Sequence, residues 1–320
     1  MSLKLGIIMD PIESIKPHKD TNLALLLEAQ RRGWTLFYME MTDLSLNNGQ
    51  VFAATRQLTV QDDPKNWFHY QAKVLMPLNT LDLVLMRKDP PVDRTYIHTT
   101  YLLDLLQKEG TPVFNHPQSL RDVNEKLFTA HFKEYCPATV VTYHAEQVHE
   151  FIAHHKKVIL KPTNGMGGTS VFMVEENGPN LNVIIETLTD HGKQPVIAQA
   201  FIEDIRHGDK RIIMVNGEPY PYALARIAAP GEVRANLAAG GHGIGLELSA
   251  RDREICKKVG PILREKNLLL VGLDVIGDYL TEINVTSPTC IRELEAIYGA
   301  NICALVLDCM SQQLESRKSP

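Results

Sequence analysis

The sequence lacks the features of a membrane-embedded, secreted or disulfide-rich protein. None of its apolar runs approaches the ~18 residues that a membrane helix needs, and the first run ends at Asp10, too early for a secretory signal. The five cysteines are odd in number and contain no CxxC pair, which argues against a disulfide framework or a zinc site. We therefore expect a cytoplasmic protein with reduced thiols.

The chain also lacks a large excess of charge of one sign. Its 33 basic and 38 acidic residues give a net charge of -5, which argues against nucleic acid or an anionic membrane as a partner. With 44% hydrophobic and 22% charged residues, the composition is that of a globular protein. A chain of 320 residues usually forms two or three domains.

Strands and helices are predicted to alternate along the first third of the chain. Helices are predicted over 21–32 and 95–108, and an Asn48-Gly49 turn predicts a hairpin. Predicted strands cover 3–9, 34–41, 51–60, 81–87 and 113–115. This alternation favours an α/β fold with a mainly parallel sheet covered on both faces.

Two further α/β units are predicted beyond Ser119. The second has helices over 120–133, 145–155 and 182–189 and strands over 139–142, 158–161, 170–174 and 196–201. The third has strands over 211–215, 220–226, 268–276 and 279–285, a helix over 250–266 and a C-terminal helix. We expect domains over residues 1–122, 123–203 and 204–320.

A glycine-rich turn follows the predicted strand that ends at Lys161. Gly165, Gly167 and Gly168 allow backbone amides to approach a phosphate closely and to form an anion-binding nest. The turn has neither the lysine of a Walker A loop nor the spacing of a dinucleotide-binding fingerprint. A flexible hairpin tip is the alternative, but the neighbouring Lys161 favours phosphate binding.

Three oxygen-bearing side chains are predicted to converge on one hairpin. Glu282 and Asn284 share a strand face, and the Gly277-Asp278 turn folds their strand beside the one that carries Asp274. Two carboxylates and an amide oxygen suit Mg²⁺. A solvent-facing hairpin is the alternative, although the flanking residues are apolar.

Arginines accompany these motifs. Arg211, Arg226, Arg234 and Arg292 bracket the glycine turn and the hairpin, and a guanidinium binds carboxylate or phosphoryl oxygens bidentately. The segment 228–245 is rich in glycine and alanine and predicts a loop. A loop of this length in a compact domain is typical of a functional lid.

Two other patterns are interpreted as structural. His149 and His154 are five residues apart, so a helix places their imidazoles about 140° apart and prevents joint binding of one metal ion. Cys290 has no nearby histidine in the sequence and is interpreted as a packing residue rather than a nucleophile.

The sequence resembles the prokaryotic glutathione synthetase family in motifs that run from end to end. These motifs are MRKDPP (86–91), NxPQSLRD (115–122), NEK (124–126), KP (161–162), GMGG (165–168), GDKR (208–211), RxNLAAGG (234–241), VGLD (271–274) and TEINVTSPTCIRE (281–293). The resemblance implies an ATP-grasp fold with an N-terminal parallel-sheet α/β domain. It also implies a homotetramer that uses ATP and Mg²⁺, or Mn²⁺, to join γ-glutamylcysteine to glycine through an acyl phosphate.

The resemblance further implies roles for individual residues. Lys126 and Lys161 would contact the nucleotide phosphates, with the glycine turn, and Asp209 would bind the ribose. The adenine edge would meet Gln199, Ala200, Phe201 and Ile202. Metal binding would fall to Asp274, Glu282 and Asn284, and the catalytic arginines would be Arg211, Arg226 and Arg234. The peptide pocket would be lined by Arg87, Asn284, Ser287, Pro288, Thr289 and Arg292.

The nucleotide and metal residues alone do not separate this activity from its rivals. Another ATP-grasp enzyme, such as a D-alanine–D-alanine ligase or a ligase that adds amino acids to a protein tail, would use the same residue types. A synapsin-like protein would bind ATP without turnover. The substrates that release ADP distinguish these three alternatives.

Overall fold

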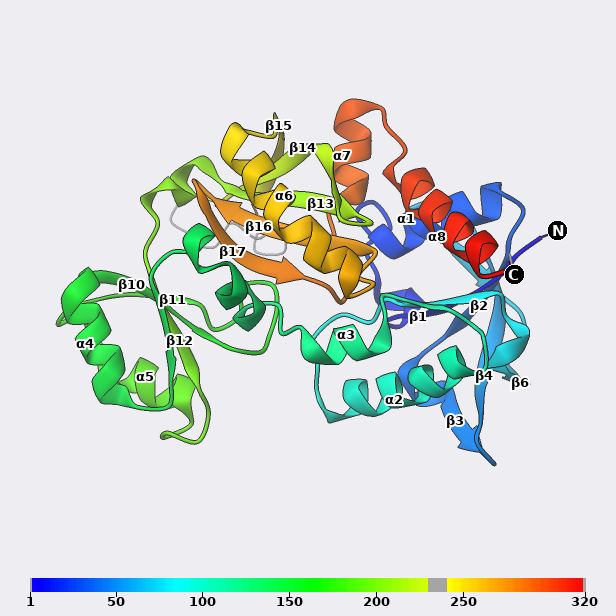
Figure 1. Cartoon of the computed structure of the whole chain (residues 1–320), viewed down its shortest axis with the longest axis horizontal. Coiled ribbons are helices and arrows are strands. Elements are labelled where there is room, and N and C mark those ends of the chain that lie inside the picture. Colours follow the sequence, from blue (N-terminus) through cyan, green and yellow to red (C-terminus); the bar gives the residue numbers. More distant parts are fainter. Residues whose placement is uncertain (1, 230–240, 319–320) are drawn as a thin grey trace.

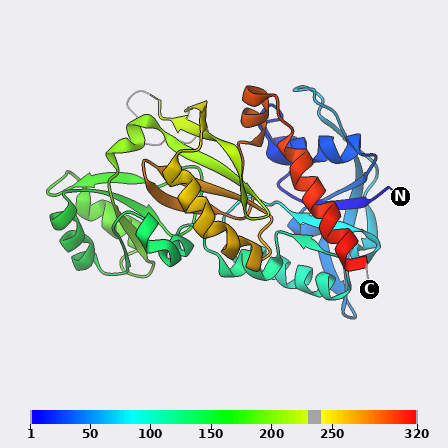
Figure 2. The same ribbon diagram turned by 45° about the horizontal axis from the view of Figure 1, so that its top comes forward.

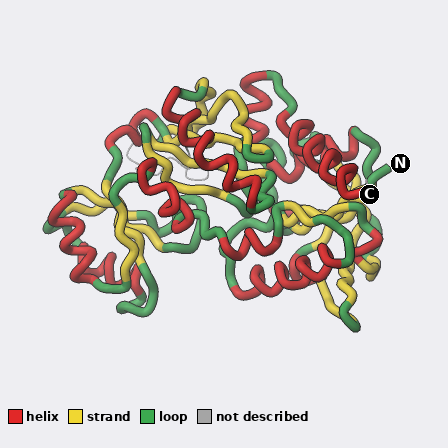
Figure 3. The backbone as a smooth tube through the Cα atoms, viewed as in Figure 1, coloured by secondary structure: helices red, strands yellow, loops and turns green. Residues whose placement is uncertain are grey.

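The structure, a computed structural model, describes residues 2–229 and 241–318, and Figure 1 shows three sheets arranged along its longest axis. Helices lie on the outside of all three sheets (Figure 3). Within the described residues no single helix has the length and apolar composition of a membrane span. Among the same residues, one pair of helices, 291–298 and 302–317, has the required length and apolar composition when taken together, and the pair is bent by 119°.

The first sheet has eight strands in the order β3-β4-β2-β1-β7-β8, with β5 and β6 also paired to β4. The strands are β1 (Lys4–Ile8), β2 (Thr35–Met39), β3 (Leu44–Asn47), β4 (Gln50–Val60), β5 (Phe68–Tyr70), β6 (Val74–Pro77), β7 (Leu83–Met86) and β8 (Val113–Phe114). Only β2, β1, β7 and β8 run parallel, whereas β4 runs antiparallel to β2. The sheet is therefore mixed: its parallel part agrees with the predicted parallel sheet, and the hairpin predicted at Asn48-Gly49 is present as β3 and β4 in its antiparallel part.

Helices cover both faces of this sheet, as its buried parallel strands require. They are α1 (Thr21–Arg31), α2 (Arg94–Lys108) and α8 (Ile302–Lys318), with α3 (Pro117–Asp122) packed on α2. The helix α7 (Ile291–Tyr298) contacts α1 and α8 but packs on strands of the third sheet. Ile7 and its neighbours pack with α1 and α8, whereas Ile8 packs on the side of α2. The C-terminal helix thus returns to the first sheet, where it lies along α1 (Figure 2).

The second sheet is antiparallel, in the order β11-β10-β12-β9. It is built from β9 (Thr139–Thr142), β10 (Lys157–Pro162), β11 (Phe172–Glu175) and β12 (Val196–Ala200), with α4 (Ala145–His155) and α5 (Leu181–Thr189). Val158, Leu160 and Ala198 pack beneath the two helices. Ile159, Lys161 and Gln199 alternate with these residues along the strands and therefore project from the opposite face of the sheet.

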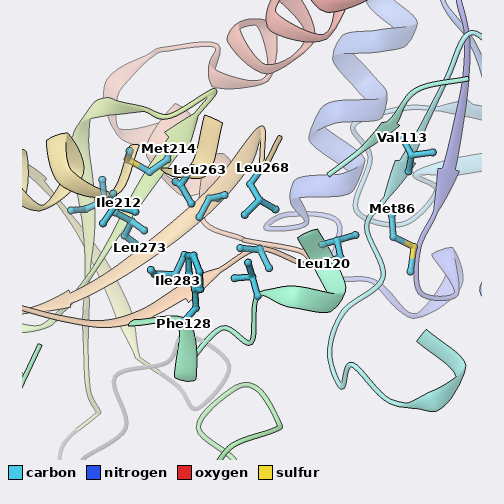
Figure 4. Close-up of a cluster of buried hydrophobic side chains, with 14 of the residues drawn as sticks. Met86, Val113, Leu120, Phe128, Ile212, Met214, Leu263, Leu268, Leu273 and Ile283 are labelled. Carbon is cyan, nitrogen blue, oxygen red and sulfur yellow. The ribbon is translucent and has the colours of Figure 1, made fainter. Parts of the chain in front are cut away.

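The third sheet is also antiparallel, in the order β15-β14-β13-β16-β17. Its elements are β13 (Asp209–Val215), β14 (Glu218–Ile227), β15 (His242–Glu247), β16 (Leu270–Ile276), β17 (Tyr279–Asn284) and α6 (Ala250–Glu265). Ile212, Leu273 and Ile283 form a core with Leu263 of α6 (Figure 4). The same cluster continues through Leu120 to the first sheet, which joins the two units.

The helix predicted over 120–133 is interrupted in the structure. The chain leaves α3 at Val123 and resumes as the 3₁₀ helix η4 (Leu127–Tyr135). Between them, the Glu125 carbonyl accepts from Ile283 N at 2.8 Å, and its carboxylate accepts from Val285 N at 2.9 Å. Tertiary hydrogen bonds to the end of β17 thus replace the helical ones.

Two other predictions also need correction. The single C-terminal helix is divided into α7 and α8, with Gly299 at φ 62° between them. The predicted loop 228–245 is shorter, because His242 already begins β15 and pairs with Ile227 of β14. Arg234 and residues 230–240 lie outside the described residues.

Candidate active site

One face of the third sheet carries a row of charged side chains. Cross-strand register pairs Asp209 with Arg226, Arg211 with Asp274, and Asp274 with Glu282. Directly paired residues project from the same face of a sheet, so these five side chains line up across four strands. Their sequence neighbours point to the other face, into the core beneath α6.

Asp274 lies at the centre of this row between two guanidinium groups. Arg211 donates through Nε to Asp274 Oδ1 at 2.5 Å, and Arg226 Nη2 lies 3.0 Å from Asp274 Oδ2. Burial alone would raise the pKa of the Asp274 carboxyl, but Arg211 and Arg226 outweigh it and hold that pKa well below its usual range. The side chain is therefore ionised throughout the physiological pH range.

Asp209 has a different environment, although it shares Arg226 as a partner. Arg226 Nη2 donates to Asp209 Oδ2 at 2.5 Å, whereas Asp209 Oδ1 is buried without a partner among the described residues. Burial raises the pKa of Asp209 to about 7, against the attraction of Arg226. The unpaired oxygen is available to a polar group of a ligand.

Two lysines from other elements meet Glu282 at the edge of the row. Lys126 Nζ and Lys161 Nζ lie 4.0 and 3.9 Å from Glu282 Oε1. Lys161 also donates to Gln199 Oε1 at 3.3 Å, and Lys126 to the Gly165 carbonyl at 2.8 Å. Burial lowers the pKa of Lys161, and the Glu282 carboxylate opposes that effect.

A cleft runs between the second and third sheets, and we call it the glycine-loop cleft. Ile159, Phe201 and Ile276 contribute apolar surface, while Lys126 and Lys161 lie in the same lining. Gly165, Gly167 and Gly168 have φ values of 106°, 66° and 76°, which favour glycine, so their backbone amides border the cleft without side chains. The lining suits a ligand with a flat apolar ring and an anionic chain.

A second cleft, which we call the N-terminal cleft, adjoins the first. Its far wall comes from loops of the first sheet and the start of α1, and includes Asp10, Lys16, Lys19, Asn22 and Asp89. Its near wall includes the charged row and Ser287, Pro288, Thr289 and Cys290 before α7. Both clefts are lined by the glycine loop, Asp274 and Glu282, so their ligands would meet at these residues.

Most residues implicated by the sequence lie where these clefts require them. The glycine-loop cleft is lined by Lys126, Lys161, Gly165, Gly167, Gly168, Gln199, Ala200, Phe201, Ile202 and Asp209. The N-terminal cleft is lined by Arg211, Arg226, Asp274, Glu282, Asn284, Ser287, Pro288 and Thr289. Residues separated by more than 150 positions thus form one continuous site.

Two arginines expected in the peptide pocket are absent from the lining that the described residues form. Arg87 is buried behind it and donates to Asn22 Oδ1 at 2.7 Å and to the Pro288 carbonyl at 2.9 Å. Arg292 donates to the Pro17 carbonyl at 2.6 Å and to the Asp62 carboxylate. Arg87 and Arg292 thus bind residues of the cleft walls or of the segments that carry them, without lining the cleft themselves.

The sequence interpretation missed the far wall of the N-terminal cleft. Asp10 follows β1, and Asp89 follows β7. These strands run parallel, and ligands of open α/β sheets bind beyond the carboxyl ends of parallel strands. This rule could have predicted Asp10 and Asp89 as cleft residues from the sequence. No short motif marks Lys16 or Lys19.

The patterns interpreted as structural have ordinary environments. His149 and His154 are both exposed on α4. The described residues contain no cluster of three or more His, Cys, Asp or Glu side chains able to hold a metal ion. Cys290 is buried in the apolar core, and burial raises the pKa of its thiol.

Two family descriptions together match almost the whole chain. "Prokaryotic glutathione synthetase, N-terminal domain" matches residues 3–121, and "Prokaryotic glutathione synthetase, ATP-grasp domain" matches residues 125–299. The glutathione synthetase of Pseudomonas syringae pv. tomato is 55% identical over 99% of this chain and 100% of its own length. That of Vibrio vulnificus is 54% identical over the same shares.

Solved structures share the fold at low sequence identity. The D-cycloserine synthetase DcsG superposes with a TM-score of 0.67 at 14% identity, covering 97% of this chain and 99% of that one. The D-alanyl-alanine synthetase A of Vibrio cholerae gives 0.59 at 13% identity, covering 98% and 99%. The ATP-grasp ligase PsnB gives 0.62 at 15%, covering 98% of each chain. These likenesses confirm the ATP-grasp fold.

Proposed function

Because the chain belongs to the prokaryotic glutathione synthetase family, we propose that it joins γ-glutamylcysteine to glycine with conversion of ATP to ADP and phosphate. The observation that supports this most directly is the junction of the two clefts at Asp274 and Glu282. A phosphoryl group can pass between ligands only where they meet. The junction carries the arginines and lysines that such a transfer needs.

The reaction begins with activation of a carboxylate, because amide formation from a free carboxylate is unfavourable in water. The C-terminal carboxylate of γ-glutamylcysteine attacks the γ-phosphorus of ATP, which releases ADP and forms an acyl phosphate. Arg211 and Arg226 neutralise the charge on the carboxylate and the transferring phosphoryl group. The amine of glycine then attacks the acyl carbon, loses a proton and expels phosphate.

The nucleotide would occupy the glycine-loop cleft. Lys126, Lys161 and the glycine loop would contact its phosphates, and Gln199–Ile202 would border the adenine. Asp209 would accept from the ribose hydroxyls, which gives its unpaired oxygen a partner. The peptide would lie in the N-terminal cleft, with its reactive carboxylate toward Arg211 and Arg226.

Asp274, Glu282 and Asn284 fit Mg²⁺ by their chemistry. All three offer oxygen atoms at neighbouring positions of one sheet face, which a hard cation prefers. Asp274 is already held by two guanidinium groups, so Glu282 and the Asn284 amide oxygen are the more accessible donors. Mg²⁺, or Mn²⁺ in its place, would neutralise phosphate charge, and the residues would orient the phosphates toward the peptide.

Further properties of the family complete the proposal. We propose that the chain acts in the cytoplasm as a homotetramer, without nucleic acid or membrane partners. Residues 1–122 would form the N-terminal α/β domain, 123–203 the small ATP-grasp domain and 204–320 the catalytic domain. The segment between β14 and β15, which includes Arg234, would close over the reactants and exclude water from the acyl phosphate.

ADP release with each substrate omitted in turn tests the proposed activity. We expect release to require γ-glutamylcysteine and glycine together. Equal release with D-alanine alone would contradict the proposal and favour a dipeptide ligase. Tight ATP binding without amine-dependent phosphate release would instead indicate a non-catalytic nucleotide-binding protein.

A further inference from the structure

The segment 11–20 forms one wall of the N-terminal cleft. It connects β1 to α1 and presents Lys16 and Lys19 to the cleft. Two of its residues, Ile12 and Pro17, are buried, while most of the positions between them are exposed. Ile15 also packs on the core, and Lys19 N and Asp20 N donate to the Lys16 carbonyl at 3.0 Å, so residues 16–20 form a local turn. Contacts from other parts of the chain then fix this turn against the body of the protein.

Four side chains from distant parts of the chain hold this segment. The Tyr38 hydroxyl accepts from Ile12 N at 3.3 Å. Trp67 Nε1 donates to the Ile12 carbonyl at 2.9 Å. Tyr70 donates through its hydroxyl to the Glu13 carboxylate at 2.6 Å. Arg292 Nη1 donates to the Pro17 carbonyl at 2.6 Å and is the contact nearest to Lys16 and Lys19 in sequence.

Arg292 joins three segments at once. Besides Pro17, it reaches Asp62 through two hydrogen bonds of 2.6 and 2.7 Å from Nη2. Its side chain is 16% exposed, whereas that of Asp62 is 62% exposed, so solvent weakens the ion pair more than the bond to Pro17. Arg292 itself lies in the first turn of α7, just after Thr289 and Cys290, which line the cleft.

We propose that Arg292 is a positioning residue for the donor peptide. It fixes the 11–20 segment against α7 and so keeps Lys16 and Lys19 at the cleft before the peptide arrives. This inference rests on the proposed function, because it takes the N-terminal cleft as the peptide site. It replaces the expectation that Arg292 contacts the peptide itself.

The physical consequence is a selective loss of peptide affinity. A wall that is not held must be ordered when the peptide binds, and that ordering reduces affinity. The glycine-loop cleft has no lining residue from segment 11–20 or from α7, so ATP binding has no reason to change. The partners of Arg292, which are Pro17 and Asp62, are not members of the charged row, so the chemical step should be preserved.

Steady-state kinetics of Arg292→Ala test the proposal. We expect KM for γ-glutamylcysteine to rise about tenfold or more, with KM for ATP and kcat within about twofold of the wild type. Arg292→Lys should recover part of the affinity, because an ammonium can reach Pro17 or Asp62 but not both. Asp62→Asn should have the smallest effect, because the Pro17 contact remains.

A matched control is Arg264→Ala on α6. Arg264 also donates to a carboxylate, Glu218 at 2.6 Å, and to a carbonyl, that of Asn216 at 3.4 Å. It lies outside the lining of both clefts, so KM for the peptide should not change in this variant. Unchanged peptide KM in Arg292→Ala, or equal increases in the KM for ATP and for the peptide, would overturn the proposal.

Proteolysis without substrates separates this inference from the proposed function. Trypsin should cut the bond after Lys19 faster in Arg292→Ala than in the wild type or Arg264→Ala, because the segment is released. Equal cleavage rates would refute the positioning role whatever the enzyme's substrates are. Another outcome is accelerated cleavage in Arg292→Ala together with a wild type that releases no ADP with γ-glutamylcysteine and glycine. That result would refute the proposed function but would still support the role of Arg292 in holding segment 11–20.

Discussion

The two faces of the third sheet are made by the same strands but serve opposite purposes. Ile212, Leu273 and Ile283 are fully buried against α6 and gain stability by leaving water. On the other face, Arg226 and Asp274 are just as inaccessible but carry charge. Burial of a charge is unfavourable unless a partner compensates it, and here each charged group compensates the next.

This difference shows how one set of strands holds a reactive surface in place. The apolar face is sealed and contributes to the free energy of unfolding. The charged face is preorganised by the rigid strands, so its groups need little rearrangement when a phosphoryl group arrives. Adjacent residues of one strand should therefore respond to mutation in opposite ways.

The largest expected effect is on activity, at Glu282. Glu282→Gln should lower kcat about 10²–10³-fold, by analogy with loss of one transition-state contact, while the melting temperature changes little. The carboxylate is 25% exposed, and among residues 2–229 and 241–318 its ion pairs are the long ones to Lys126 and Lys161, so its replacement removes little packing. ADP release and thermal unfolding measure the two quantities. Turnover within a few-fold of the wild type at saturating Mg²⁺ would show that Glu282 is not a metal ligand.

The next residue should show the reverse pattern. Ile283→Ala leaves a cavity beneath α6 and should lower the free energy of unfolding by about 2–5 kcal/mol. Activity per folded molecule at low temperature should stay close to that of the wild type. Denaturant titration and ADP release check this. A loss of kcat as large as that of Glu282→Gln would contradict the separation of the two faces.

A smaller effect is expected from the proposed lid, which would close over the charged face. Arg234→Ala should lower kcat about tenfold with little change in KM, because the guanidinium would act on charge that develops during the reaction. Trypsin should cut at Arg234, and ATP, Mg²⁺ and γ-glutamylcysteine together should slow that cut. Cleavage at the same rate with and without ligands, together with normal turnover of the variant, would refute the lid.

The smallest effect concerns a charge outside the cleft. Hydrogen bonds from Arg31, against burial, lower the pKa of Glu28 from 4.5 to about 2, with help from Arg32. A lowered carboxyl pKa stabilises the fold above pH 4.5, and this stabilisation is lost as pH falls through about 2. Glu28→Gln should therefore be about 1 kcal/mol less stable at pH 7, because exposure of Arg31 weakens the pair. Urea titrations should show the full difference at pH 7, a smaller one at pH 3 and none below about pH 2.

Much of the fold and of the site was accessible from local sequence patterns. Capping and turn residues set the elements: Asp20 accepts from Leu23 N at the start of α1, and Asn216-Gly217 makes the turn between β13 and β14. Strand alternation placed Glu282 and Asn284 on one face. The position of Lys161 just before the glycine turn suggested its role, whereas the assignment of Lys126 came from the motif resemblance alone.

What local patterns did not specify depended on partners distant in sequence. Residues 120–133 have helical periodicity, yet Glu125 leaves the helix because the end of β17 offers better hydrogen bonds. The first sheet became mixed because β4 pairs antiparallel with β2, and a strand's own sequence does not specify that direction. Arg292 does bind a carboxylate, but it is that of Asp62, which is 230 positions away and which no local pattern identifies as its partner.

The sequence by itself determined the strands, the helices, the glycine loop and the alternation that separates charge from core. These features depend on contacts within a few residues, where periodicity and turn chemistry are sufficient. Only the tertiary structure decided that Asp10, Lys16 and Asp89 face the charged row, and that α8 returns to α1. Such contacts form when the chain closes over hundreds of residues, and the free energy that selects them comes from burial summed over the whole molecule.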